Sequence, residues 1–279
     1  MRLETLHYRG TVLRTALAVV ALCGTVHARE AEPYEQLSAA PEGDLVGLLD
    51  RVASARSSRD ARAAAALAVA NLLERGHSDP VTDRALEALG ALGARESGRI
   101  LAQYTRHRRP AARQRAFTAL GQVAGEDPAL RRRVADGLRD SAANVRGAAA
   151  RALETLQARE ATPLLLQAVG RGVPEAAATL GAIGEPSSLE GFHAYLRKQP
   201  LDVMLSGYQR YLQRPDIDEK AKLDVVARLE DVAGPAVLRF VSELSRQPKL
   251  SPAVRQAAET ATLRIGKALA QPAAKGAKP

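Results

Sequence analysis

Hydrophobic and polar residues recur along the chain with the period of an α-helix. A shared thirteen-residue pattern begins at seven positions: Asp60, Pro80, Ala111, Asn144, Arg171, Lys220 and Ala253. In the copy from Asn144, "NVRGAAARALETL", positions six and nine are alanine and positions ten and thirteen are leucine. Positions six, nine, ten and thirteen lie on one face of a helix. Each copy therefore predicts an amphipathic helix, and its small or β-branched sixth residue lets a neighbouring helix come close.

The spacing of these helices predicts a repeat. Most copies start 27 to 33 residues after the previous one, which is the period of a helical hairpin. Partner helices are expected from Pro128, Ala161, Ser187 and Pro235, and the long gap before Lys220 is expected to hide a diverged unit. Strand-like alternation is not seen. A hairpin of this kind buries its apolar face only against the next one, so the predicted fold is all-α, an α-solenoid (superhelix) of stacked hairpins.

Several of these stretches resemble a known family. "VRGAAARALETL" (Val145–Leu156), "VRQAAETATLRI" (Val254–Ile265) and "ARQRAFTALGQV" (Ala112–Val123) are similar to HEAT repeats, in the short form also found in phycobilisome-lyase-like proteins. "ATPLLLQAV" (Ala161–Val169) resembles the first helix of that repeat. The resemblance implies a solenoid over residues 45–266 and a protein-binding scaffold, although a few family members act on bilins or DNA.

Basic residues share the third position of five copies: Arg62, Arg113, Arg146, Lys222 and Arg255. They could form a basic ladder along one surface. The resemblance instead implies that they pair with carboxylates or helix ends of the neighbouring repeat, and this second interpretation is favoured.

The N-terminus has the features of an export signal. Arg9 and Arg14 precede an apolar run of about a dozen residues, and Val26 and Ala28 occupy the small-residue positions that signal peptidase needs. The run is too short to span a bilayer. We therefore expect a signal peptide at 1–28, a polar lead at 29–44, the repeats at 45–266 and a disordered tail at 267–279. The mature protein is expected to be periplasmic or secreted, with no transmembrane anchor and no cysteine.

Catalytic and metal-binding patterns were sought without success. After cleavage only His77, His107 and His193 would remain, none at metal-ligand spacing. No Gly-x-Ser-x-Gly elbow and no phosphate-binding glycine loop is present. The sequence thus predicts no cofactor, no metal and no enzymatic activity. A lyase-like enzyme stays as a weak alternative.

Two local features exceed what the repeat needs, and both are candidate partner-binding residues. One is the basic turn "RHRRPAARQR", with Arg106, Arg108, Arg109, Arg113 and Arg115; the other is the aromatic set Phe192, Tyr195, Tyr208 and Tyr211. Interfaces favour Tyr and Arg. The competing interpretations are a solvated turn for the first and core filling for the second.

The net formal charge is +9, which permits an acidic partner without naming one. The favoured function is an exported, non-enzymatic scaffold that binds a protein of the cell envelope. The alternative is a basic solenoid that binds nucleic acid or another anionic polymer. Nucleic acid is the less favoured ligand, because aromatic residues are not interleaved with the basic run as base stacking would require.

Overall fold

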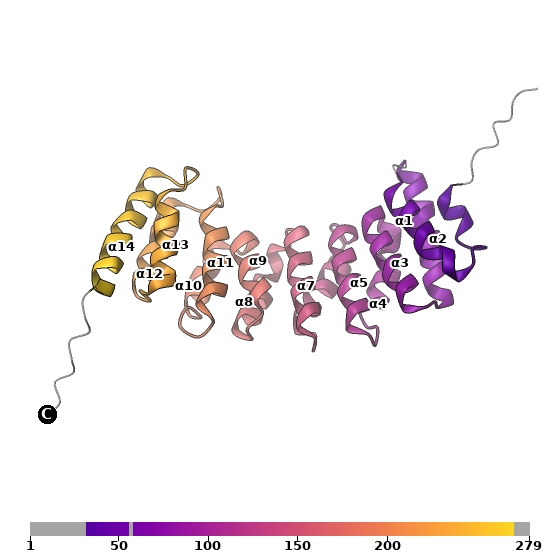
Figure 1. Ribbon diagram of the computed structural model, residues 1–279, viewed down its shortest axis with the longest axis horizontal. Helices are drawn as coiled ribbons and strands as arrows, with labels where there is room; N and C mark the ends of the chain where they lie inside the picture. The colour runs from indigo at the N-terminus through magenta and orange to yellow at the C-terminus, as the bar shows by residue number, and fades with distance from the viewer. Residues whose placement is uncertain (1–31, 56–57, 271–279) are drawn as a thin grey trace, which may run out of the picture. The chain divides into compact units, whose positions relative to one another are not determined.

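The computed structural model describes residues 32–55 and 58–270, and in these ranges it contains helices and turns but no strand. From α1 to α11 the α-helices alternate between two rows (Figure 1). The first row holds α1 (Glu42–Ser54), α3 (Asp79–Leu92), α5 (Pro110–Val123), α7 (Ala143–Thr155), α9 (Pro174–Ile183) and α11 (Leu201–Leu212). The second row holds α2 (Arg59–Arg75), α4 (Gly98–Tyr104), α6 (Pro128–Asp136), α8 (Thr162–Gly170) and α10 (Leu189–His193). After α11, α12 (Glu219–Glu230) packs on α14 (Pro252–Ala270) as first-row neighbours pack on each other, and α13 (Pro235–Ser245) packs on α14. Short 3-10 helices lie between them: η1 (Pro33–Gln36), η2 (Arg95–Ser97), η3 (Gly137–Arg139), η4 (Arg159–Ala161) and η5 (Pro186–Ser188).

Contacts between helices are those of a stacked repeat. Within the first row α1 packs on α3, α3 on α5, α5 on α7, α7 on α9 and α9 on α11. From α2 to α8, each second-row helix packs on the first-row helix that follows it, as α2 does on α3 and α8 on α9. The predicted all-α solenoid is therefore confirmed.

The sixth position of the repeat pattern is buried in all seven copies: Ala65, Ala85, Ala116, Ala149, Ala176, Val225 and Ala258. Burial at the thirteenth position is less uniform, since Leu156 and Val232 are only half-buried. The predicted helical face is thus the packing face, and its centre is the small residue at position six.

The seven copies do not all belong to one row. Those from Pro80, Ala111, Asn144 and Arg171 form α3, α5, α7 and α9 in the first row, and those from Lys220 and Ala253 form α12 and α14, which pack on each other as first-row neighbours do. The copy from Asp60 forms α2 in the second row and is therefore not equivalent to the others. The gap between the copies from Asp60 and Pro80 is short because α2 and α3 are the two arms of one hairpin. Helices of both rows bury a face with a small residue at its centre.

The long gap before Lys220 contains a diverged unit, as predicted. It is the pair α10 and α11, and α11 packs on α9 in the same way as the earlier first-row helices. In contrast, α11 makes far fewer contacts with α12 and α13 than with α9.

Small residues set the distance between first-row helices. A Cβ built on Gly90 would lie 3.1 Å from the Cα of Ala119, and one on Gly121 would lie 3.0 Å from the Cα of Ala152. Backbones that approach this closely leave no room for a larger side chain. The row is therefore held together by direct contact of helix backbones and alanine methyl groups.

Arginines at the third position of the repeat pattern make hydrogen bonds to the turn that precedes their own helix. Arg113 Nη1 donates to the carbonyl oxygens of His107 (3.0 Å) and Arg108 (3.2 Å). Arg146 Nη1 donates to those of Asp140 (3.0 Å) and Ser141 (2.9 Å), which stand at the same offsets. These two arginines are therefore paired with other groups of the solenoid and do not form an open basic ladder.

The predicted boundaries need adjustment at both ends. Residues 32–44 are not only a polar lead, because they contain η1, the buried Leu37 and the start of α1. Residues 267–270 belong to α14 rather than to a tail. The proposed signal peptide, residues 29–31 and residues 271–279 lie outside the described part of the chain. None of the described helices is both long and apolar enough to cross a membrane.

Candidate partner-binding surface

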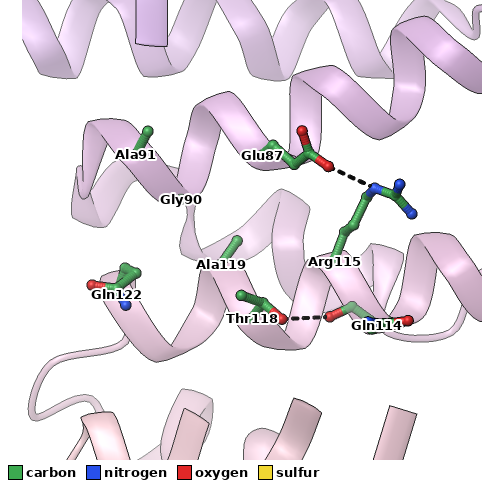
Figure 2. Close-up of a pocket in the computed structure, with 8 residues that line it drawn as sticks. All are labelled: Glu87, Gly90, Ala91, Gln114, Arg115, Thr118, Ala119 and Gln122. Atoms are coloured by element: carbon green, nitrogen blue, oxygen red, sulfur yellow. Dashed lines mark hydrogen bonds and ion pairs between the residues drawn. The ribbon is translucent and has the colours of Figure 1, made fainter. Parts of the chain in front are cut away.

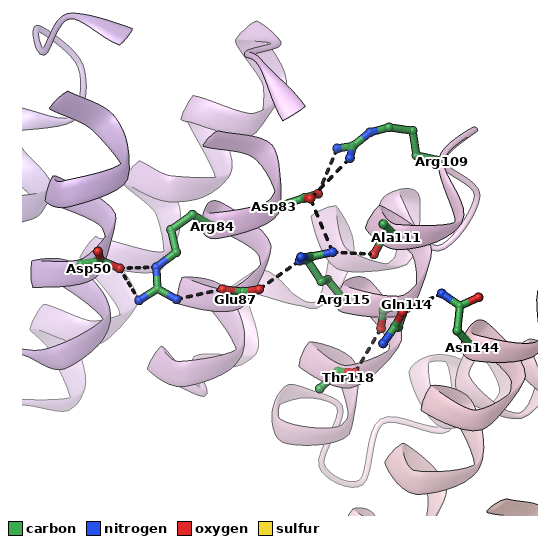
Figure 3. A network of polar contacts seen from close by, with 10 residues as sticks. All are labelled: Asp50, Asp83, Arg84, Glu87, Arg109, Ala111, Gln114, Arg115, Thr118 and Asn144. Atoms are coloured by element: carbon green, nitrogen blue, oxygen red, sulfur yellow. Dashed lines mark hydrogen bonds and ion pairs between the residues drawn. The ribbon is translucent and has the colours of Figure 1, made fainter. Parts of the chain in front are cut away.

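A chain of ion pairs crosses the exposed side of the first row, from α1 through α3 to α5 (Figure 3). Arg84 pairs with Asp50 of α1 and, at 2.8 Å, with Glu87 of its own helix. Glu87 then accepts from Arg115 Nε of α5 at 2.9 Å, and Arg115 also lies 3.4 Å from Asp83. We call these five residues the polar ladder. It ties three successive first-row helices together at the surface.

Opposite charges of the ladder are in direct contact with one another. Burial alone would raise the pKa of Glu87, but hydrogen bonds from Arg84 and Arg115 outweigh it and lower that pKa. The hydrogen bond that Arg84 donates to Glu87 is the main cause that raises the pKa of Arg84. Both groups therefore stay charged at neutral pH and neutralise each other, so the ladder presents polar groups without a strong net field.

A hollow of about 590 Å³ lies beside the ladder, between α3 and α5 (Figure 2). Small residues, Gly90, Ala91 and Ala119, line one part of it, and Gln114, Thr118 and Gln122 follow one stripe of α5. The Thr118 hydroxyl donates to the Gln114 carbonyl oxygen at 3.1 Å, and Gln114 Oε1 accepts from Asn144 Nδ2 of α7 at 2.6 Å. The hollow thus combines small residues with an uncharged stripe of Gln114, Thr118 and Gln122, the glutamine stripe, and Gln114 links this stripe to α7.

Three of the five predicted arginines are held by carboxylates of neighbouring repeats. Arg109 lies 2.9 Å from both Asp79 and Asp83. Arg113 makes a two-pronged pair with Asp140, 2.8 Å at each prong, and Arg115 belongs to the polar ladder. The predicted basic cluster is consequently divided, and only Arg106 and Arg108 are exposed without a carboxylate within ion-pair distance among the described residues.

Comparison with known proteins gives matches only among solved structures. No family model matches the chain. The curated proteins likewise give no match. A designed armadillo repeat protein is 14% identical, covering 84% of this chain and 98% of its own, with a TM-score of 0.40.

Two further solved structures are also similar. The archaeal HEAT-like repeats protein from Thermococcus onnurineus NA1 is 14% identical over 86% of this chain and 97% of its own, with a TM-score of 0.30. Human deoxyhypusine hydroxylase is 18% identical over 85% of this chain and 95% of its own, with a TM-score of 0.22. Likenesses this distant transfer no activity. The repeat pattern and the stacked helices show that the described chain is an α-solenoid, and its repeats resemble HEAT repeats.

The aromatic set of the solenoid is part of its core. Phe192, Tyr208 and Tyr211 are buried, and Tyr195 is half-buried. Phe192 and Tyr208 meet edge to face with ring centroids 4.9 Å apart. These large rings fill the space where the repeat diverges at α10 and α11. Their location corrects the prediction that they form an exposed binding surface, and core filling is the interpretation that fits.

A buried histidine joins the same aromatic group. His193 Nδ1 lies 2.7 Å from the hydroxyl of Tyr208, and its Nε2 lies 3.3 Å from Asp224 of α12. Burial lowers the pKa of His193 and raises that of Tyr208 well above its ordinary value. The imidazole is therefore neutral at pH 7 and sealed from solvent, which suits a structural link better than acid–base chemistry.

Metal-binding clusters were sought in the solenoid as well. Within residues 32–55 and 58–270, no group of three or more His, Cys, Asp or Glu side chains is arranged to hold a metal ion. His77 lies 2.6 Å from Glu42, and this two-residue contact joins α1 to the residues just before α3.

The sequence analysis did not predict the glutamine stripe or the acidic residues of the polar ladder, Asp50, Asp83 and Glu87. Gln114, Thr118 and Gln122 stand four positions apart, so they share a face of α5. That spacing was the available signal.

Proposed function

We propose that this protein is an exported, non-enzymatic scaffold that binds a protein partner of the cell envelope through the first-row surface. The observation that carries the proposal is the hollow between α3 and α5, where the glutamine stripe lies beside the ion-paired polar ladder. Solenoids present extended surfaces built from successive repeats. A polypeptide laid across this row would meet amide donors and acceptors from one repeat after another.

The chemistry of the hollow supports binding rather than catalysis. Its one hydroxyl, on Thr118, donates to a helix carbonyl oxygen, and its carboxylate, Glu87, is neutralised by two arginines. A nucleophile needs an adjacent base, and a general acid needs a raised pKa. Neither condition is met by the residues that line this hollow, while amide groups and small residues suit a polypeptide.

Site-specific crosslinking in the native host tests the surface. A photoreactive residue replacing Gln122 should capture an envelope protein. The same residue replacing Gln167, an exposed glutamine of α8 in the second row, is the matched control and should capture little. Equal capture from both positions, or capture from Gln167 alone, would contradict the first-row assignment.

A further inference from the structure

The turns inside successive hairpins follow one another along one edge of the solenoid. Tyr104, at the end of α4, donates its hydroxyl to the carbonyl oxygen of Leu73 in α2 at 3.1 Å. Arg133 Nε of α6 donates to the Thr105 hydroxyl at 2.6 Å, and Gln199 Nε2 donates to the Gly170 carbonyl oxygen at 3.1 Å. We call the turns 105–109, 137–142, 171–173 and 194–200 the turn edge.

Exposed arginines recur on this edge in three successive hairpins: Arg106, Arg108, Arg139 and Arg171. Among the described residues, none of the four lies within ion-pair distance of a carboxylate, and none of their side chains makes a hydrogen bond. This contrasts with Arg109 and Arg113, which point to the carboxylates of neighbouring repeats. The turn edge therefore carries cations that the fold does not use.

Arg133 belongs to the same part of the turn edge as Arg106, because its side chain is bound to Thr105, the residue before Arg106. The half-buried Arg133 guanidinium is anchored on Thr105, and the nearby charge of Arg106 adds to burial in lowering the pKa of Arg133. Asp136 and Asp140 act in the opposite direction but do not cancel this effect. Like charges held together without an anion cost free energy. An oxyanion placed between the two guanidinium groups would relieve that cost.

The turn edge offers no apolar anchor. The large hydrophobic side chains that are exposed among the described residues are Leu67, Leu263 and Leu269, on α2 and α14. Tyr195 is half-buried, and Lys198 Nζ already lies 5.8 Å from its ring centre. Protein interfaces rely on buried aromatic or aliphatic anchors, and single-stranded nucleic acid relies on stacking platforms. A ligand recognised by charge alone fits this edge better than either.

We infer that the turn edge binds a linear polymer of phosphate groups, with Arg106 and Arg133 holding one phosphate and Arg108, Arg139 and Arg171 holding others. Guanidinium forks match phosphate oxygens in pairs, and the recurrence of cations from hairpin to hairpin matches a ligand with recurring charge. This ligand is separate from the protein partner on the first row. It also revises the sequence-based choice of arginines, since Arg109, Arg113 and Arg115 are already neutralised.

Binding of long-chain inorganic polyphosphate to the purified chain tests the inference. Four phosphate contacts should make affinity fall ~50-fold between 50 and 200 mM salt. The test variant carries Arg106→Gln, Arg108→Gln, Arg139→Gln and Arg171→Gln. It should fold normally, because the four side chains make no internal bonds among the described residues. Its affinity at low salt should fall at least about tenfold and its salt dependence should flatten.

The matched control has the same change of charge at four exposed arginines elsewhere: Arg51→Gln, Arg59→Gln, Arg239→Gln and Arg246→Gln. It should keep its affinity within about twofold if contact, rather than net charge, decides binding. Equal losses in the two variants would overturn the inference. Poly-glutamate or orthophosphate, at the same concentration of anionic groups, should bind more weakly than polyphosphate, and equally tight binding of either would also overturn the inference. Binding to phosphatidylglycerol vesicles without binding to soluble polyphosphate would overturn it as well.

Discussion

Gly181 and Gly207 meet where α9 packs on α11, and neither position has room for a methyl group. A Cβ on Gly207 would lie 2.7 Å from the carbonyl oxygen of Ala177, and one on Gly181 would strike the carbonyl group of Gly207 itself. Because the obstacle at Gly181 is the backbone of Gly207 rather than a flexible side chain, relief there requires the two helices to move apart.

Gly181→Ala is therefore expected to destabilise the solenoid by about 1–3 kcal/mol through overpacking. Gly47→Ala is the control, since Gly47 lies within α1 and nothing stands within 4 Å of its added Cβ. There the better helix propensity of alanine should stabilise by up to about 1 kcal/mol. Urea unfolding of both variants measures the two effects, and a neutral Gly181→Ala would show that the α9–α11 contact is looser than described.

Arg214 is expected to hold the end of α9. Its buried guanidinium donates to the carbonyl oxygen of Gly184 at 2.6 Å and to Asp216 at 3.0 and 2.8 Å. Arg214→Met should cost about 1–3 kcal/mol, because buried carbonyl groups would lose their donor. Arg159→Met removes a more exposed partner of the same Asp216 and should cost less than about 1 kcal/mol. Thermal unfolding compares them, and equal losses would contradict a special role for Arg214.

The buried His193 should make stability fall as the pH drops from 7 to 5. Its pKa in the folded state is lowered by burial, so below the ordinary value near 6.5 the unfolded chain binds more protons than the folded one. Stability is complete above that value and decreases below it. Charged groups around the ring are Asp224, Glu190 and Arg228. The carboxylates with the largest shifts titrate at more acid pH: the pKa of Glu42 is lowered to about 2, and that of Asp216 is strongly lowered by its hydrogen bonds from Arg214.

His193→Asn should flatten this pH dependence, because the asparagine amide can take the place of Nδ1 beside the Tyr208 hydroxyl but does not titrate. The measurement is the unfolding midpoint of both proteins at several pH values between 5 and 7. His107 also has a pKa lowered by burial and by Arg109, so some slope should persist. A variant with the full slope of the parent would exclude His193 as its source.

Export predicts a mature N-terminus at Arg29, after Val26 and Ala28. N-terminal sequencing of the protein from the periplasmic or secreted fraction of its native host checks this. An intact Met1 in the cytosolic fraction would contradict both the cleavage site and the envelope location of the proposed partner.

The helical face of each repeat could be predicted from sequence because burial there depends on local spacing. The small residues at position six, such as Ala149, were identified in this way and are buried. The row to which a helix belongs could not be predicted, because α2 and α3 bury equivalent faces on opposite sides of one hairpin. That distinction depends on which helix each one touches, and a single periodic pattern does not encode it.

The candidate site was less predictable for a related reason. Arg113 and Asp140 are 27 residues apart and meet only because neighbouring hairpins stack. A run of arginines therefore looks uniformly basic in sequence, although its members differ in what the next repeat places beside them. The burial of Tyr208 could not be predicted for the same reason, because it follows from the larger space in the diverged unit, where the alanine pattern is missing.

The turn hydrogen bonds made by Arg113 and Arg146 have a consequence for how such a chain can change length. Each arginine stands 33 positions from the other and donates to carbonyl oxygens five and six residues before itself. Donor and acceptors thus belong to the same hairpin. Excision or duplication of the stretch from one arginine to the next would join equivalent positions and leave no turn without its donor. Unequal recombination within the gene could therefore add or remove a hairpin in a single event, and each product would inherit complete turns.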